Sequence, residues 1–116
     1  MKISKIIILS IVLGVATMVS FASANGNAVP LVIDVRTEAE WNDGHLKDAV
    51  LIPYDRIEQG ITAAAPEKNT KIYLYCRSGR RSGIADETLK KAGYQDLINL
   101  GTMENAAKEL KRPIVK

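Results

Sequence analysis

The chain has 116 residues, of which 25% are charged, and a formal net charge of +3 at pH 7. This length suits one small domain, and so weak a charge, part of it in an N-terminal leader, gives no indication of a nucleic acid or an acidic membrane surface as partner. The single cysteine excludes a disulfide within the chain, so its free thiol needs a chemical explanation.

Residues 1–24 have the three parts of a secretory signal peptide. Lys2 and Lys5 make a basic start, residues 6–19 are apolar and uncharged, and residues 22–24 read Ala-Ser-Ala, a cleavage signal. A membrane-spanning helix is the alternative, but the apolar run is shorter than the roughly 20 residues that cross a bilayer. We therefore expect removal of residues 1–24 and a mature periplasmic domain, residues 25–116, without stable membrane association.

The mature domain begins with a predicted strand and helix. Val29–Val35 is largely apolar and ends beside the charged residues Asp34 and Arg36. Open α/β sheets place their sites at this end of a strand. Thr37 and Glu40 have the spacing of a capping box, so we expect a helix to begin there and to end at the next glycine.

Strand and helix signals then alternate to the C-terminus. We expect a short strand closed by Pro53, a helix over residues 55–65, a central strand over 71–75, a helix over 82–92, a strand over 97–100 and a helix over 103–110, with Pro113 ending the regular structure. Alternation of this kind predicts an α/β fold with a central parallel sheet and helices on both of its faces.

The loop between the central strand and the next helix carries the candidate chemistry. It begins at Cys76 and contains Arg77, Arg80 and Arg81. A strand, a short loop and a helix start direct backbone N–H groups at one point. A free thiol has a pKa of about 8.5 and reacts as the thiolate. Because the amides, the helix start and the arginines all favour the anion, we predict that Cys76 is a low-pKa nucleophile rather than an inert buried cysteine.

Two motifs resemble those of the rhodanese family, sulfurtransferases that carry sulfane sulfur as a cysteine persulfide. The loop from Cys76 to Arg81 reads C-x4-R, whereas the loops of tyrosine phosphatases and of cell-division-cycle phosphatases read C-x5-R and would need an arginine at Ser82. Residues 34–53 are similar to the family segment D-V-R-x-x-x-E-[YFW]-x-x-G-H-x-x-x-A-x-x-I-P. The resemblance spans residues 31–101 and is strongest to small periplasmic members, so it implies a single rhodanese-like domain.

The resemblance implies a mechanism without metal or cofactor. Cys76 takes sulfane sulfur from thiosulfate or a similar anionic donor and passes it to cyanide or a thiol. The backbone amides of the loop would hold the persulfide and its arginines would attract the donor, Arg81 most strongly. The residues of this anion cradle are Arg77, Ser78, Gly79, Arg80, Arg81 and Ser82.

Four further residues receive supporting roles from the resemblance. Asp34 would accept hydrogen bonds that brace the loop, and Arg36 would be held in a structural ion pair. His45 would pack and form hydrogen bonds rather than act as a base, because a thiolate needs no proton abstraction. Trp41 is expected in the core.

Two alternative functions stay open. A persulfide or thiol-redox carrier that delivers sulfur to a protein partner would use the same loop. A phosphatase or arsenate reductase on the related scaffold is disfavoured by the loop length.

The chain departs from the family pattern in three places. Lys47-Asp48 replaces a usual Pro-Gly, and Gly101-Thr102-Met103 replaces Gly-Gly followed by an aromatic residue, which alters the pocket wall. Residues 25–30 are too few for the strand and helix that many members have at this point. We therefore expect a monomer or weak oligomer in which one face of the sheet is more open or is covered by a neighbouring subunit.

Overall fold

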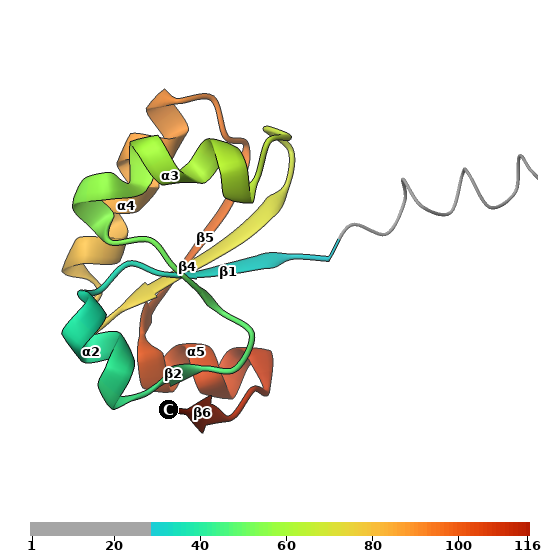
Figure 1. Cartoon of the computed structure of the whole chain (residues 1–116). Coiled ribbons are helices and arrows are strands. Elements are labelled where there is room, and N and C mark those ends of the chain that lie inside the picture. Colours follow the sequence, from blue (N-terminus) through green and yellow to red (C-terminus); the bar gives the residue numbers. More distant parts are fainter. Residues whose placement is uncertain (1–28) are drawn as a thin grey trace, which may run out of the picture.

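A parallel sheet of four strands forms the centre of residues 29–116, the part of the chain that the computed structural model describes (Figure 1). The predicted signal peptide lies outside the described residues. The strands follow the order β3 (Val50–Leu51), β1 (Leu31–Asp34), β4 (Lys71–Cys76) and β5 (Asp96–Thr102), and a separate antiparallel pair joins β2 (His45–Leu46) to β6 (Ile114–Val115). The helices are α2 (Glu38–Asp43), α3 (Ile57–Ala64) after a 3-10 turn (Tyr54–Arg56), α4 (Arg80–Lys91) and α5 (Met103–Leu110).

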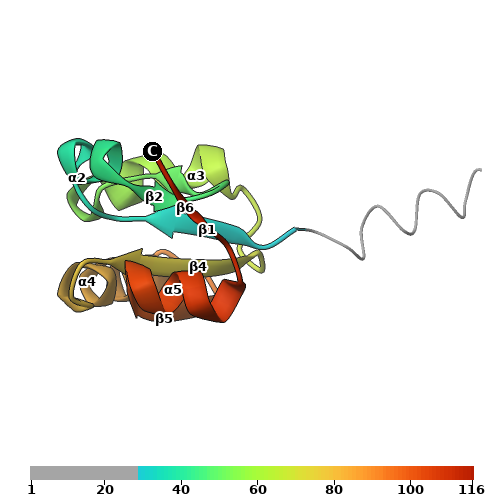
Figure 2. The same ribbon diagram turned by 90° about the horizontal axis from the view of Figure 1, so that it is seen from below.

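The two central strands bring the candidate site residues to the same end of the sheet. β1 and β4 are parallel, with Ile33 opposite Leu74, and both residues are fully buried. A parallel strand covered on both faces is apolar along its length rather than in alternation. In Figure 2 both strands point toward α2 and the start of α4. Asp34 and Cys76, the last residues of β1 and β4, therefore lie at one end of the sheet, as the sequence predicted.

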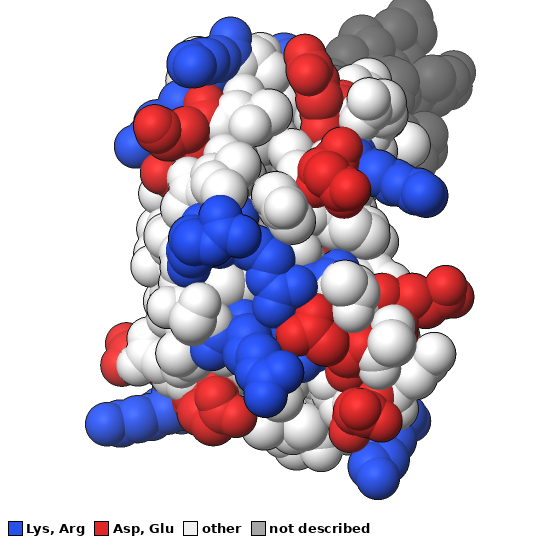
Figure 3. All heavy atoms as spheres, turned by 90° about the vertical axis from the view of Figure 1, so that its left-hand side faces the viewer, with Lys and Arg blue, Asp and Glu red and all other residues white. Residues whose placement is uncertain are grey.

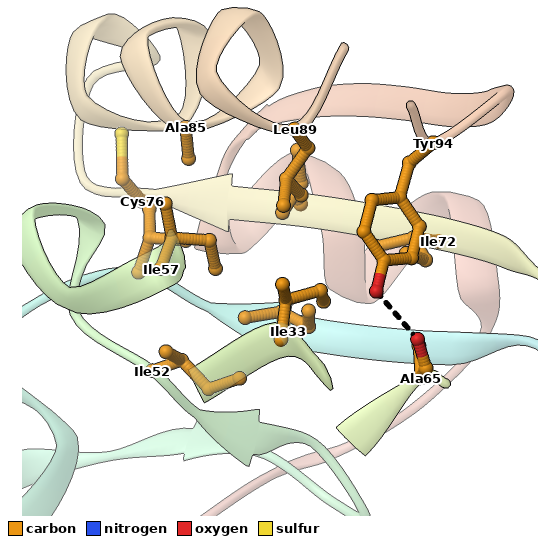
Figure 4. Packing of buried hydrophobic residues seen from close by; sticks show 12 residues of the cluster. Ile33, Ile52, Ile57, Ala65, Ile72, Cys76, Ala85, Leu89 and Tyr94 are labelled. Carbon is orange, nitrogen blue, oxygen red and sulfur yellow. Dashed lines mark hydrogen bonds between the residues drawn. The ribbon is translucent and has the colours of Figure 1, made fainter. Parts of the chain in front are cut away.

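Helices cover both faces of the sheet, which confirms the predicted α/β fold. α3 and α4 lie on one face (Figure 1), where Ile33, Ile72 and Leu89 are buried in one apolar cluster (Figure 4). On the other face, α5 and the β2–β6 pair cover Val32 and Tyr75. Within residues 29–116, no helix is long and apolar enough to cross a membrane.

The predicted elements are present, with bounds that differ from the predictions by at most two residues. α5 has the predicted bounds. α4, however, begins at Arg80 rather than Ser82, because Gly79 adopts a φ of 97° and caps the helix without a side chain. The prediction that regular structure ends at Pro113 is wrong, since β6 follows it and pairs with β2.

The expectation of an open sheet face is also wrong for the described residues. The C-terminal segment of this chain covers that face, and Leu46 of β2 and Ala106 of α5 are completely buried there. The Leu46 N–H donates to the Tyr75 hydroxyl at 3.0 Å, which ties β2 to β4. The face therefore needs no neighbouring subunit to cover it.

Candidate active site

Cys76 lies at the end of β4, fully buried, with three loop residues between it and α4. The last of these, Gly79, has the positive φ that favours glycine, whereas a Cβ there would meet only an ordinary van der Waals contact, 3.6 Å from the Gly101 Cα. This turn places the first residues of α4 beside the thiol. The N–H groups of a first helical turn have no partner within the helix, so they are available to an anion.

The Cys76 sulfur is held by the loop's own polar groups. Figure 4 shows the side chain pointing toward the first turn of α4. The Gly79 N–H donates to Sγ at 2.9 Å, and the Ser82 hydroxyl lies 3.5 Å from Sγ. Burial raises the pKa of Cys76, but hydrogen bonds from the Ser82 hydroxyl and from the amides of Ser82, Gly79 and Ser78 outweigh it, so the pKa lies below its ordinary value. The thiol is therefore poised to ionise.

The three arginines of the loop are not equivalent in the structure. Arg81 is part of the first turn of α4, and its side chain is 18% exposed. Hydrogen bonds to Glu40 raise the pKa of Arg81 most, and charge on Cys76 adds a smaller rise. Arg77 is 78% exposed, and Arg80 lines a separate hollow along α4 with Gly83, Ile84, Glu87, Thr88 and Lys91. Of the three, Arg81 is thus the guanidinium that a sheltered ion pair holds beside the loop.

Glu40 is the site residue that the sequence analysis missed. It completes the predicted capping box at the start of α2, since it accepts from the Thr37 N–H at 3.0 Å and its own N–H donates to the Thr37 hydroxyl. The same carboxylate accepts from Arg81 Nη1 at 2.7 Å and from Nη2 at 2.9 Å. These bonds from Arg81 are the largest cause that lowers the pKa of Glu40 to about 2. Its capping position was visible in the sequence, but its ion-pair partner was not.

Asp34, the last residue of β1, and Arg36 form a buried ion pair. The Asp34 carboxylate accepts from the Arg36 backbone N–H, from Nε and from Nη2, the last at 2.7 Å. Arg36 Nη2 also donates to the Gly44 carbonyl at 2.6 Å. The structural ion pair expected for Arg36 is present. The expectation that Asp34 braces the loop is wrong, because its carboxylate accepts hydrogen bonds from Arg36, two residues later in the chain.

His45 and Trp41 form a stacked pair. Their ring centroids lie 3.5 Å apart, and His45 Nδ1 lies 3.0 Å from the Trp41 carbonyl oxygen. The packing role expected of His45 agrees with this geometry. Trp41 is only partly buried and belongs to neither apolar cluster, so its expected place in the core is wrong.

A hollow of about 250 Å³ opens beside the loop. It is lined by Arg36, Glu40, Asp43, Arg77, Met103 and Glu104. Met103 contributes apolar surface at the point where the sequence lacks the expected aromatic residue. Figure 3 shows this end of the domain, with Lys and Arg side chains gathered near its middle and acidic side chains beside them. Within residues 29–116, no group of His, Cys, Asp and Glu side chains is placed to hold a metal ion.

The Glu40–Arg81 ion pair predicts a pH-dependent stability. The pKa of Glu40 is about 2 in the folded chain, below the ordinary 4.5, so the pair stabilises the fold above pH 4.5 and this contribution is lost as the pH falls toward 2. Glu40→Gln should lower the free energy of unfolding at neutral pH by about 1 kcal/mol. In urea unfolding, the difference from the unchanged protein should vanish as the pH approaches 2.

Glu38→Gln is the matched control for that measurement. Glu38 lies in the same first turn of α2 and is exposed. The variant should change stability by a few tenths of a kcal/mol at most. A difference for Glu40→Gln that stays constant down to about pH 2 would contradict the assignment.

Comparison with known proteins identifies a rhodanese-like domain in this chain. The family described as "Rhodanese-like domain" matches residues 18–105. "Thiosulfate sulfurtransferase PspE" of Escherichia coli (strain K12) is 36% identical over 75 residues, which cover 65% of this chain and 72% of that protein. "Putative sulfur carrier protein YrkF" of Bacillus subtilis (strain 168) is 38% identical over 69 residues, which cover 60% of this chain and 36% of that protein.

A solved structure resembles this chain over nearly the full length of the solved protein. It is described as "rhodanese with anions from E. coli" and has a TM-score of 0.70 and 34% sequence identity, with coverage of 76% of this chain and 99% of that chain. The sequence and structure comparisons thus lead to the same fold.

Proposed function

Because this chain belongs to the rhodanese-like domain family, we propose that it is a thiosulfate sulfurtransferase in which Cys76 carries the transferred sulfur as a persulfide. The sulfurtransferase among its relatives supports sulfur transfer in general, and the choice of thiosulfate as donor is our proposal. One observation gives this proposal its strongest support. The Gly79 N–H lies 2.9 Å from Cys76 Sγ, in a loop whose hydrogen bonds lower the pKa of that thiol.

The proposed reaction is a double displacement at sulfur. The Cys76 thiolate attacks the terminal sulfur of thiosulfate, a Cys76 S–S bond forms, and the S–S bond of the donor breaks. Sulfite leaves with that bond's electron pair. Cyanide or a thiolate then attacks the outer sulfur of the persulfide, which leaves thiocyanate or a new persulfide, and Cys76 recovers the electron pair as thiolate. The hydrogen bonds that lower the pKa of Cys76 favour its thiolate, so we assign no general base to either step.

The loop would stabilise the charge that moves through these steps. The backbone N–H groups of residues 77–82 and the start of α4 would hold the anionic end of the persulfide. Arg81 and Arg77, which both lie near Glu40, would attract the sulfonate of the donor. Arg80 lines the separate hollow along α4, so we give it no part in binding the donor.

The proposal is tested by weighing the protein after incubation with thiosulfate. The expected result is a gain of one sulfur atom on the peptide that contains Cys76, reversed by cyanide with release of thiocyanate. No gain, together with hydrolysis of an aryl phosphate, would overturn the proposal in favour of a phosphatase. The C-x4-R loop argues against that outcome.

A carrier that delivers persulfide sulfur to a protein is the second candidate. The relative named as a putative sulfur carrier favours it, although this chain spans only 36% of that protein. Both candidates predict the sulfur gain on Cys76. They separate in the second step, because a carrier should transfer its sulfur to a protein thiol much faster than to cyanide or to a small thiol.

We also propose that residues 1–24 direct export to the periplasm and that the released domain is a monomer or weak oligomer that binds no nucleic acid. When the full chain is produced in a bacterium with a periplasm, the soluble periplasmic fraction should contain a protein that begins at Asn25. Intact-mass measurement of that fraction checks the cleavage point. A full-length protein that stays with the membrane would contradict the prediction.

A further inference from the structure

Glu40 lies between two arginines of the Cys76 loop. Its two carboxylate oxygens each accept one hydrogen bond from Arg81, and Arg77 Nη1 lies 3.9 Å from Oε2. The side chains of Glu40 and Arg81 are 21% and 18% exposed, so their ion pair is largely sheltered from water. Within residues 29–116, these are the ion pairs that the loop arginines form.

This arrangement changes what an incoming anion meets. Arg81 presents a planar pair of N–H donors that matches a carboxylate or a sulfonate, and Glu40 already occupies that pair. The Cys76 sulfur is held instead by the Gly79 amide and lies near the Ser82 hydroxyl. In the resting site, the backbone therefore stabilises the thiolate, while the charge of Arg81 is largely cancelled.

We propose that Glu40 is a specificity-determining residue that competes with anions for Arg81. An anion that offers only oxygens must displace Glu40 to reach the guanidinium. A sulfur donor also gains the contact of its terminal sulfur with Cys76 and the loop amides, so it tolerates this competition better than sulfate does. The inference rests on the proposed function, because the anion that the site would select is the sulfur donor of that reaction.

The surrounding charges make Glu40 the position at which loss of a charge should most change the potential at the loop. Glu40 faces Arg81 on α4, Arg77 in the loop and Arg36 after β1. The charge of Arg36 is balanced by Asp34 at 2.7 Å. Asp43 and Glu104 line the same hollow but pair with no loop arginine. Loss of the Glu40 charge should therefore release positive potential from Arg81 and Arg77 at the mouth of the loop.

Glu40→Gln removes this charge with little change in shape. Glutamine can occupy the same position of a capping box, and its Oε1 can still accept from the Thr37 N–H. Its amide nitrogen replaces the oxygen that accepts from Arg81 Nη2, so one arm of the guanidinium is freed. Glu38→Gln, an exposed change in the same helical turn, removes an equal charge without touching Arg81.

The experiment measures alkylation of Cys76 by iodoacetamide across a pH series, with and without inorganic sulfate. For Glu40→Gln we expect the pKa of Cys76 to fall by about half a unit, which is about threefold in the thiol–thiolate equilibrium. The sulfate concentration that half-protects Cys76 should fall by about threefold as well. Glu38→Gln should match the unchanged protein in both measurements.

Two results would overturn the inference. One is an unchanged or raised pKa of Cys76 in Glu40→Gln without tighter sulfate protection, which is what a purely structural role predicts. The other is an equal change in Glu38→Gln, which would reflect general surface charge. Neither measurement involves sulfur transfer, so a failure of the proposed function would leave this test intact, and the reverse also holds.

Arg81→Gln, alone and combined with Glu40→Gln, tests the same competition from the side of the guanidinium. Arg81→Gln alone leaves the Glu40 charge uncancelled, so it should raise the pKa of Cys76 and weaken sulfate protection. Glu40→Gln combined with Arg81→Gln restores the charge balance and should return the pKa of Cys76 toward its value in the unchanged protein. If the pKa of Cys76 in the double variant differs from that of the unchanged protein as much as it does in Arg81→Gln, competition for Arg81 is refuted.

Discussion

Cys76→Ser should abolish sulfur uptake from thiosulfate while the domain stays folded. Serine is slightly smaller and more polar than cysteine, but its hydroxyl oxygen can fit the fully buried position and accept the hydrogen bond from the Gly79 N–H. A hydroxyl, however, does not ionise near neutral pH as a thiol of lowered pKa does. Without an anionic nucleophile, no bond to the donor's terminal sulfur forms. We expect the rate of thiocyanate formation to fall to the uncatalysed level, a loss of at least about a thousandfold.

The measurement is thiocyanate formation from thiosulfate and cyanide, together with the intact mass of each protein after exposure to thiosulfate. A thermal melt should place Cys76→Ser close to the unchanged protein, which separates loss of chemistry from loss of fold. Cys76→Ala should be equally inactive, but less stable by about 1 kcal/mol, because the Gly79 N–H loses its acceptor. Sulfur uptake by Cys76→Ser would mean that another group carries the sulfur.

The fold was largely predictable because its signals are local. The spacing of Thr37 and Glu40 alone predicts the start of α2, and the observed capping box contains both of their reciprocal hydrogen bonds. The buried run of β1 and the last residue of β4 also indicated where a site would lie. β6 gave no such signal, since two residues after a proline have no periodicity, and their pairing with β2 depends on the packing of α5.

The site was less predictable because it depends on helix geometry and on distant partners. Gly79 starts α4 by its positive φ, so Arg80 and Arg81 belong to a helical turn rather than to an extended loop. Successive helical residues point about 100° apart, which directs these two guanidiniums to different surfaces. The pairing of Arg81 with Glu40 joins residues 41 positions apart. The sequence showed three arginines near Cys76, but it did not show which surface each guanidinium would face.

These findings give backbone amides and side-chain charges separate roles at the site. The thiol is activated by the loop that immediately follows it, through Gly79 and Ser82, so its environment is encoded within a few residues. The charges around the loop are set by α2, through Glu40. We therefore expect substitutions in α2 to alter anion preference, and to change the pKa of Cys76 only through charge, without moving the amides that lower it.

Asp34→Asn should cause the largest loss of stability, about 3–5 kcal/mol, because it leaves the Arg36 guanidinium buried without its counter-charge. Asp34 is fully buried and Arg36 is 6% exposed, so water cannot replace the lost carboxylate. The hydrogen bond from Arg36 Nη2 to the Gly44 carbonyl cannot neutralise the charge. A loss of this size is a large part of the roughly 5–15 kcal/mol that stabilises a typical domain.

Asp96→Asn makes the same substitution in an exposed ion pair and serves as the control. Asp96 lies 3.3 Å from Lys71, and the two side chains are 42% and 43% exposed. We expect it to lose less than about 1 kcal/mol. Combining Asp34→Asn with Arg36→Met removes the stranded charge and should recover part of the loss, since the methionine can remain buried without a partner. Urea unfolding of the four proteins checks the order, and equal losses for Asp34→Asn and Asp96→Asn would show that burial of the Asp34–Arg36 pair does not determine its contribution.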